Sequence, residues 1–153
     1  MMATKIPTGK FGEQFTQFKH KPKDAIKYLK KVKRGECIAA LYRPDIGDID
    51  IVWGTPGQNG YGLSHIISEH GAEIKQLGFE IEDFIVLVFT FGKKVQYKNQ
   101  TRIFLDGETY RIVIETRWYN TNKNLIVTAF DLRPIQKKNP KRMKELNTKK
   151  RLR

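Results

Sequence analysis

Three runs of alternating apolar and polar residues close this chain and limit the folds that it can form. They span residues 94–104, 109–118 and 125–132, and a period of two is typical of strands with one buried face. Asp106-Gly107 connects the first two runs and residues 119–124 connect the last two, both with the composition of hairpin turns. The pattern predicts an antiparallel meander at the C-terminal end.

The N-terminal part shows helical spacing instead. Three phenylalanines follow each other at intervals of four and three residues: Phe11, Phe15 and Phe18. They predict a short helix within residues 1–18. A second helix is expected from Pro22 to about Arg34, because proline suits a first turn and Gly35 suits the stop. Helices followed by an antiparallel sheet predict an α+β fold, with N-terminal helices packed on a C-terminal antiparallel sheet.

The middle of the chain contains two short strands, a glycine-rich loop and further helices. Residues 36–42 and 48–53 have strand composition, and the loop at 54–62 leads into a helix. We expect that helix to begin near Ser64, as its cap, and to end near Gly71 or one turn beyond. Residues 80–92 are β-branched and aromatic, but their acidic start and Gly92 favour a helix.

The net charge of +13 is concentrated at the two ends of the 153 residues. Residues 1–36 hold ten Lys or Arg against three acids, residues 133–153 hold ten against one, and residues 37–132 hold nine against twelve. We expect a lead-in at 1–24, one domain at 25–132 and a mobile basic tail at 133–153. Such a tail either contacts a polyanion such as RNA or only solubilises the domain.

Several site classes are excluded by composition. The single Cys37 allows no intrachain disulfide and no CxxC pair. The spacing of the three histidines matches no familiar zinc site, so no metal and no cofactor are expected. No segment approaches the roughly 18 apolar residues of a membrane span, so no membrane association is expected.

Two histidines stand on the helix after the glycine-rich loop. Their spacing of five residues puts His65 and His70 about 140° apart around a helix, so they are not expected to face one ligand. His65, at the helix start beside a flexible loop, is placed to meet a substrate as a base. His70 precedes Gly71, where an imidazole can bond the last carbonyls, and we expect it to be structural.

Two aspartates, Asp48 and Asp50, share one face of a predicted strand. Paired carboxylates of this kind can hold Mg²⁺, as in nucleotidyltransferases. The alternative is that they make turn hydrogen bonds and pair with Arg43 or a lysine.

Three segments resemble a known family: IAALYRPDIGDIDIVWG, GYGLSHIISEH and NLIVTAFDL. Over residues 25–132 they are similar to phage-associated nucleases of the barnase-, EndoU-, colicin- and RelE-like group. The resemblance implies the fold of that group and a toxin domain that cuts RNA without a metal. It also implies an immunity protein as partner and a cytoplasmic site of action, after delivery within a larger phage or secreted protein.

The resemblance extends to individual residues. His65 matches the family's histidine, His70 its second histidine, and Thr128 the threonine of its final strand, a candidate phosphate or substrate contact. The sequence departs from the family pattern at Val127 and in the apolar character of residues 84–91.

Cleavage of RNA by its own 2′-hydroxyl requires a base, an acid and stabilisation of charge on the phosphate. Arg111 suits the last task, because a guanidinium donates two parallel hydrogen bonds to a phosphate. On the predicted strand it shares a face with Glu115 and Arg117, which predicts a charged stripe that is either functional or simply solvated. Tyr119 or Trp118 is placed to stack on a splayed base.

Together these observations predict a monomeric, metal-independent endoribonuclease with His65, Arg111 and Thr128 as catalytic residues. The predicted substrate contacts are Arg117, Tyr119 and His70. Two alternatives remain open: a non-catalytic RNA- or DNA-binding module that uses the basic ends, and a metal-dependent nucleotidyltransferase that uses Asp48 and Asp50.

Overall fold

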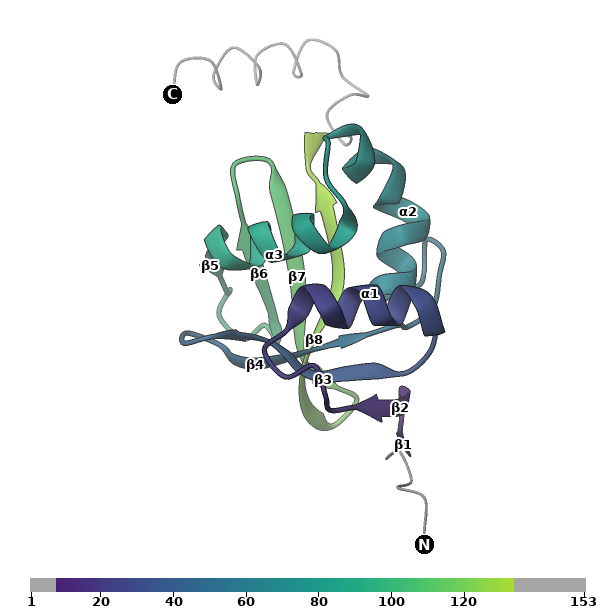
Figure 1. Ribbon diagram of the computed structural model, residues 1–153. Coiled ribbons are helices and arrows are strands. Elements are labelled where there is room, and N and C mark those ends of the chain that lie inside the picture. The colour runs from purple at the N-terminus through teal and green to yellow at the C-terminus, as the bar shows by residue number, and fades with distance from the viewer. Residues whose placement is uncertain (1–7, 134–153) are drawn as a thin grey trace, which may run out of the picture.

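The computed structural model describes residues 8–133, which form one sheet and three helices (Figure 1). The strands are β1 (Thr8–Gly9), β2 (Gly12–Phe15), β3 (Glu36–Arg43), β4 (Gly47–Val52), β5 (Lys93–Val95), β6 (Arg102–Asp106), β7 (Tyr110–Trp118) and β8 (Thr121–Asp131). The helices are α1 (Pro22–Val32), α2 (Gly62–Gln76) and α3 (Ile81–Phe91). The α+β class is therefore confirmed. The predicted basic tail lies, except for Arg133, outside the described residues.

The sheet takes strands from both halves of the chain, in the order β1-β2-β3-β4-β8-β7-β6-β5. Strands β2 and β3 run parallel, as do β4 and β8, and the other neighbours run antiparallel. The expected purely C-terminal, antiparallel sheet is therefore incomplete. Only Asp50 and Leu125 pair β4 with β8, so this long-range junction leaves little trace in the sequence pattern.

The N-terminal phenylalanines do not form the helix that their spacing predicts. Residues Gly12–Phe15 form β2 instead, which pairs with β3. Phe15 and Phe18 pack into the main core, whereas Phe11 packs on a second, separate cluster. The intervals of four and three are thus produced by rings that serve two different clusters, and strand pairing with β3 decides the local structure.

Two helices agree with the sequence prediction. Helix α1 begins with Pro22 in its first turn and ends at Val32, where Lys33 adopts the left-handed conformation (φ 55°) that Gly35 was expected to supply. Helix α3 confirms the helix predicted within residues 80–92, and two acids stand in its first turn as expected. None of the helices in residues 8–133 is long and apolar enough to cross a membrane.

The C-terminal meander differs from the prediction at its two ends. The first alternating run forms two strands, β5 and β6, because the polar residues 96–101 between them leave the sheet. The last connection is tighter than expected, since Trp118 pairs with Thr121 and only Tyr119 and Asn120 lie in the turn.

Two apolar clusters lie on opposite faces of the sheet. Helix α3 crosses β6 and β7, α1 lies over β3 and β4, and α2 runs beside β8 (Figure 1). The main core lies where these helices meet the sheet. On β7 Ile112 and Ile114 belong to this core, whereas Val113 between them belongs to the other face. We call this other group the second cluster: Val52, Val113, Leu125 and Val127, with Phe11, Tyr61, Phe104, Trp118 and Phe130 packed against it.

Candidate active site

The loop at residues 54–61 fixes the position at which α2 begins. Thr55 and Tyr61 exchange backbone hydrogen bonds of 3.0 and 3.1 Å, which close the loop. Gly62 follows with φ +80°, and a Cβ at this position would lie 2.8 Å from Cγ2 of Val52. Only glycine fits this close approach to β4. The start of α2 therefore packs closely against the end of β4, and His65 lies in the first turn of the helix.

Ser64 does not cap α2 with its side chain, contrary to the sequence prediction. Its backbone N–H donates instead to the carbonyl of Trp53 at 2.8 Å, so the end of β4 satisfies part of the first turn. The helix then continues to Gln76. This end lies five residues beyond Gly71, slightly more than the one extra turn that the sequence led us to expect.

His65 is held at both ring nitrogens. Nδ1 lies 2.7 Å from the carbonyl oxygen of Gly57, and Nε2 lies 3.0 Å from Oγ1 of Thr128. A carbonyl only accepts, so Nδ1 carries the hydrogen and the lone pair of the neutral ring lies on Nε2, toward the threonine. His65 is only 8% exposed, which corrects the expectation of an open position.

A β-bulge aims Thr128 at this histidine. On β7 Val113 pairs with Thr128 and the next residue, Ile114, pairs with Ile126, so Val127 is an extra residue without a partner of its own. Bulges of this kind re-aim side chains and are frequent beside active sites. Val127, where the sequence departs from the family pattern, is therefore the residue that shifts the register.

His70 is oriented by a carboxylate. Its Nδ1 lies 2.8 Å from Oε1 of Glu73, one helical turn further along α2. The second oxygen of Glu73 accepts the backbone N–H of Asp131 at 3.0 Å, so the carboxylate is fixed by both α2 and β8. A carboxylate in this position fixes the orientation of the imidazole and the ring nitrogen that carries the hydrogen.

The two histidine rings lie side by side, although their spacing predicts different directions. The ring centroids of His65 and His70 are 5.4 Å apart in an edge-to-face arrangement. Both rings turn toward β8, where His65 bonds Thr128 and His70 lies 5.4 Å from the ring of Phe130. The angle around the helix axis describes only where the two side chains leave the backbone. The rings of His65 and His70 then bend toward the same strand, β8.

Arg111 lies on the same sheet face as Thr128, two residue pairs along the ladder of β7 and β8. It pairs with Phe130 in the register of β7 and β8. Its guanidinium binds Asp106 through two hydrogen bonds of 2.7 and 3.0 Å and lies over the ring of Phe104 at 4.6 Å. The hydrogen bonds to Asp106 raise the pKa of Arg111 above its ordinary value, against the effect of partial burial. The group is therefore charged, but it contacts Asp106 rather than His65.

The other predicted substrate contacts lie further along β7. Arg117 is exposed, and Tyr119, in the turn that follows, is 77% exposed. Glu115 is not part of a solvated stripe, because it is buried and binds Thr101 and Arg102. Burial acts to raise the pKa of Glu115, but these hydrogen bonds outweigh it and lower the pKa.

The two aspartates of β4 have separate partners. Oδ1 of Asp48 lies 2.8 Å from Nε2 of His20. Asp50 accepts the N–H of Ala39 at 2.6 Å and binds Nζ of Lys123 at 2.7 Å. The structure thus favours the structural interpretation, with His20 and Lys123 as partners in place of Arg43. Residues 8–133 contain no group of three His, Cys, Asp or Glu that could hold a metal ion.

Lys123 links three strands by binding both Asp50 and the fully buried Glu36. Burial alone would lower the pKa of Lys123, but its hydrogen bonds to the two carboxylates raise it above the ordinary value. The ammonium group therefore holds β3, β4 and β8 together at the only pairing between β4 and β8.

Two residues of the site were not identified from the sequence. Glu73 was detectable in principle, because a carboxylate three residues after a helical histidine lies next to it. The carbonyl of Gly57 was not, because its contact with His65 depends on the closed shape of the loop.

Comparison with known proteins gives one family. Residues 40–136 match the family model described as phage-Barnase-EndoU-ColicinE5/D-RelE like nuclease1. No curated protein sequence matches the chain.

Proposed function

This chain belongs to the family of phage barnase-, EndoU-, colicin E5/D- and RelE-like nucleases, and we propose that it is a metal-independent endoribonuclease. One observation supports the proposal above all: His65 and His70 lie 5.4 Å apart, each with Nδ1 bound to an acceptor. Such a pair can supply a base and an acid to one reaction. RNA brings its own nucleophile, so the protein needs to provide no more than proton transfer and charge stabilisation.

We assign the proton transfers from the hydrogen bonds of the two rings. The substrate 2′-hydroxyl takes the place of the Thr128 hydroxyl at Nε2 of His65, gives up its proton there and attacks the adjacent phosphorus. The bond from phosphorus to the 5′-oxygen breaks, and His70, protonated and oriented by Glu73, gives this oxygen a proton from Nε2. The products are a 2′,3′-cyclic phosphate and a 5′-hydroxyl.

Charge on the phosphate falls to the neighbouring groups. In this proposal Thr128 turns its hydroxyl to a phosphate oxygen, and Arg111 on the same sheet face adds positive charge. Arg117 and Tyr119 contact the strand beyond the cut. These assignments rest on the shared face of β7 and β8 and on the resemblance of His65, His70 and Thr128 to the family's residues.

The test is cleavage of a labelled RNA by the purified full chain in EDTA. DNA of the same sequence and its 2′-O-methyl RNA serve as parallel substrates. We expect cleavage of the RNA alone, with 2′,3′-cyclic phosphate ends. Cleavage that requires Mg²⁺ would favour the nucleotidyltransferase hypothesis. Binding of RNA without cleavage would favour the non-catalytic module. Equal cleavage of DNA would refute attack by the 2′-hydroxyl.

We further propose that the domain acts as a toxin on RNA in the cytoplasm and is neutralised by an immunity protein. The family description, which names phage and colicin nucleases, supports this role. Expression of the chain in bacteria should arrest growth, and His65→Ala should relieve the arrest. Growth arrest that persists with a folded His65→Ala protein would contradict it.

A further inference from the structure

Four aromatic rings from three separate segments meet at one end of the second cluster. We call them the aromatic corner: Phe11, Tyr61, Trp118 and Tyr119. The ring centroids of Tyr61 and Trp118 are 4.7 Å apart, those of Phe11 and Trp118 5.3 Å, and those of Trp118 and Tyr119 5.9 Å. None of the four is buried, and Tyr119 is 77% exposed. Faces of these rings therefore remain open to solvent.

Two grooves open beside Phe11, and Lys10 and Phe11 line both. The larger, of about 450 Å³, is also lined by Tyr61, Trp53 and the residues at the end of α1. The smaller, of about 180 Å³, is lined by Trp118 and Lys123 among others. Both grooves have aromatic walls and share the ring of Phe11, an arrangement that suits consecutive flat groups that stack on rings.

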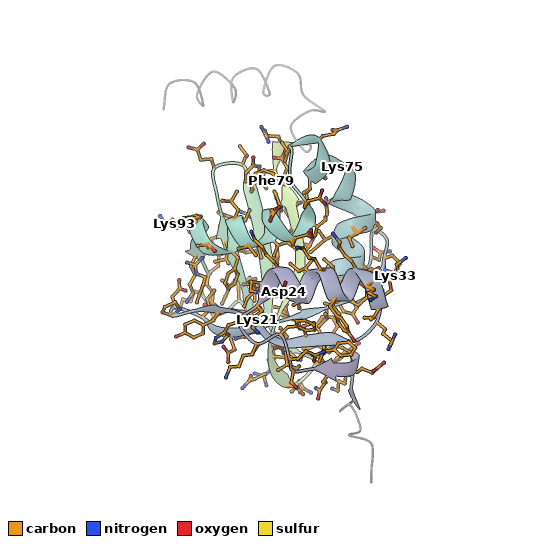
Figure 2. The ribbon with its side chains drawn as sticks, viewed as in Figure 1. Lys21, Asp24, Lys33, Lys75, Phe79 and Lys93 are labelled. Carbon is orange, nitrogen blue, oxygen red and sulfur yellow. The ribbon has the colours of Figure 1, made fainter. Side chains whose placement is uncertain are left out.

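Cations accompany the rings. The ammonium group of the exposed Lys10 lies 5.5 Å from the ring centroid of Tyr119. Lys33 and Arg34 line the larger groove, and Figure 2 shows Lys33 at the end of α1. Within residues 8–133 no carboxylate pairs with Lys10 or Lys33, whereas Arg34 pairs with Glu13. Phosphates are the groups that such unpaired lysines beside stacked rings bind well.

The aromatic corner is continuous with the candidate active site. Tyr61 precedes His65 by four residues, and the hairpin that carries Trp118 and Tyr119 continues into β8 and Thr128. Lys123 and Thr128 are five residues apart on β8, or about 16 Å. Nucleotides bound at the aromatic corner therefore lie beyond the reacting pair of nucleotides, along the same RNA strand.

We propose that the aromatic corner and its two grooves bind the bases and phosphates of single-stranded RNA next to the cleavage site. The inference rests on the proposed ribonuclease function and names its substrate as unpaired RNA. Stacking rings need splayed bases, which a duplex does not offer. Lys10 and Lys33 contact phosphates, and the rings accept bases of any identity.

Tryptophan fluorescence tests this subsite directly, because the chain has two tryptophans and both line the grooves. A single-stranded 2′-O-methyl RNA, which cannot be cut by its own 2′-oxygen, is titrated into the full chain. We expect saturable quenching, with weaker binding by the blunt duplex of the same sequence. Tyr119→Ala should weaken binding roughly tenfold, and Lys10→Ala should weaken it and reduce its salt dependence.

Two matched variants control for general effects. Tyr42→Ala removes a tyrosine that is 52% exposed on β3, and Lys93→Ala removes an exposed lysine on β5, the sheet edge opposite β1 (Figure 2). Both should bind as the unmodified chain does.

The subsite and the nuclease fail in different ways. Absence of RNA cleavage, together with quenching that Tyr119→Ala weakens, would leave the subsite standing and remove the nuclease. Cleavage without quenching, equal binding of single strand and duplex, or unchanged binding by both Tyr119→Ala and Lys10→Ala would overturn the subsite.

Discussion

A single hydroxyl connects β8 to the proposed base. Thr128 lies 3.0 Å from Nε2 of His65, and Thr128→Val removes this hydroxyl while keeping the β-branched shape that suits a strand. We expect the single-turnover cleavage rate in EDTA to fall about fivefold, because one hydrogen bond contributes about 1 kcal/mol and a tenfold change in rate corresponds to about 1.4 kcal/mol. Thr90→Val, at an exposed threonine of α3, is the control. An unchanged rate in folded Thr128→Val would remove Thr128 from the site.

Cys37 reports whether each variant is folded. It is the only cysteine, it is fully buried, and burial raises the pKa of its thiol to about 12. A buried, protonated thiol reacts slowly with alkylating reagents at mildly alkaline pH. Rapid alkylation therefore identifies a variant that has lost its fold, and loss of activity in such a variant is not interpreted.

Asp50 is expected to stabilise the fold without taking part in cleavage. Asp50→Asn keeps an oxygen for the N–H of Ala39 but removes the charge beside Lys123. We expect the free energy of unfolding to fall by about 1–3 kcal/mol, measured by denaturant titration, with activity in EDTA largely retained. Loss of activity without loss of stability would place Asp50 in the site and revive the metal-dependent hypothesis.

Glu73 joins α2 to β8 and holds the proposed acid. Glu73→Gln keeps an oxygen for the backbone N–H of Asp131 but removes the charge beside His70. We expect cleavage to slow by roughly tenfold or more, because Nδ1 of His70 loses the charged acceptor that fixes the orientation of its ring. Stability should change little.

The matched control for this variant is Glu69→Gln, at an exposed position of the same helix. It should leave the cleavage rate unchanged. If Glu73→Gln lowers stability but leaves the single-turnover cleavage rate as it was, Glu73 only ties α2 to β8.

Local patterns predicted the elements whose signals are contained within one segment. Helix α1 begins with a proline, and helix α3 has two acids in its first turn and Gly92 after its end. The hairpin of β7 and β8 turns within the segment whose composition predicted a turn. The patterns failed where a distant partner decides the structure. β2 is a strand because it pairs with β3, and nothing in the spacing of Phe11, Phe15 and Phe18 reports that partner.

The candidate site shows the same division. Resemblance selected His65 and Thr128, which are 63 residues apart, and the structure joins them by a hydrogen bond. Helical spacing predicted that His65 and His70 point in different directions. It takes no account of β8, toward which both rings turn. The bulge at Val127 depends on the register of two strands, so the sequence does not reveal it.

The charge of the molecule as a whole concerns affinity more than chemistry. Residues 137–153 hold nine Lys or Arg against one acid, and they lie outside the described residues. If they contact RNA phosphates, their deletion should weaken RNA binding and flatten the dependence of affinity on salt, with the cleavage rate at saturating RNA nearly unchanged. Equal salt dependence with and without residues 137–153 would favour a solubilising role or an acidic protein partner.

The cleavage rate of His65→Ala in EDTA tests the central claim most directly. Removal of a general base is expected to lower the single-turnover rate by about 10²–10⁴-fold, while Cys37 stays protected and the fold is retained. His20→Ala, at an exposed histidine that binds Asp48 outside the site, should cleave as the unmodified chain does. A folded His65→Ala protein that cleaves RNA at the unmodified rate would contradict the account.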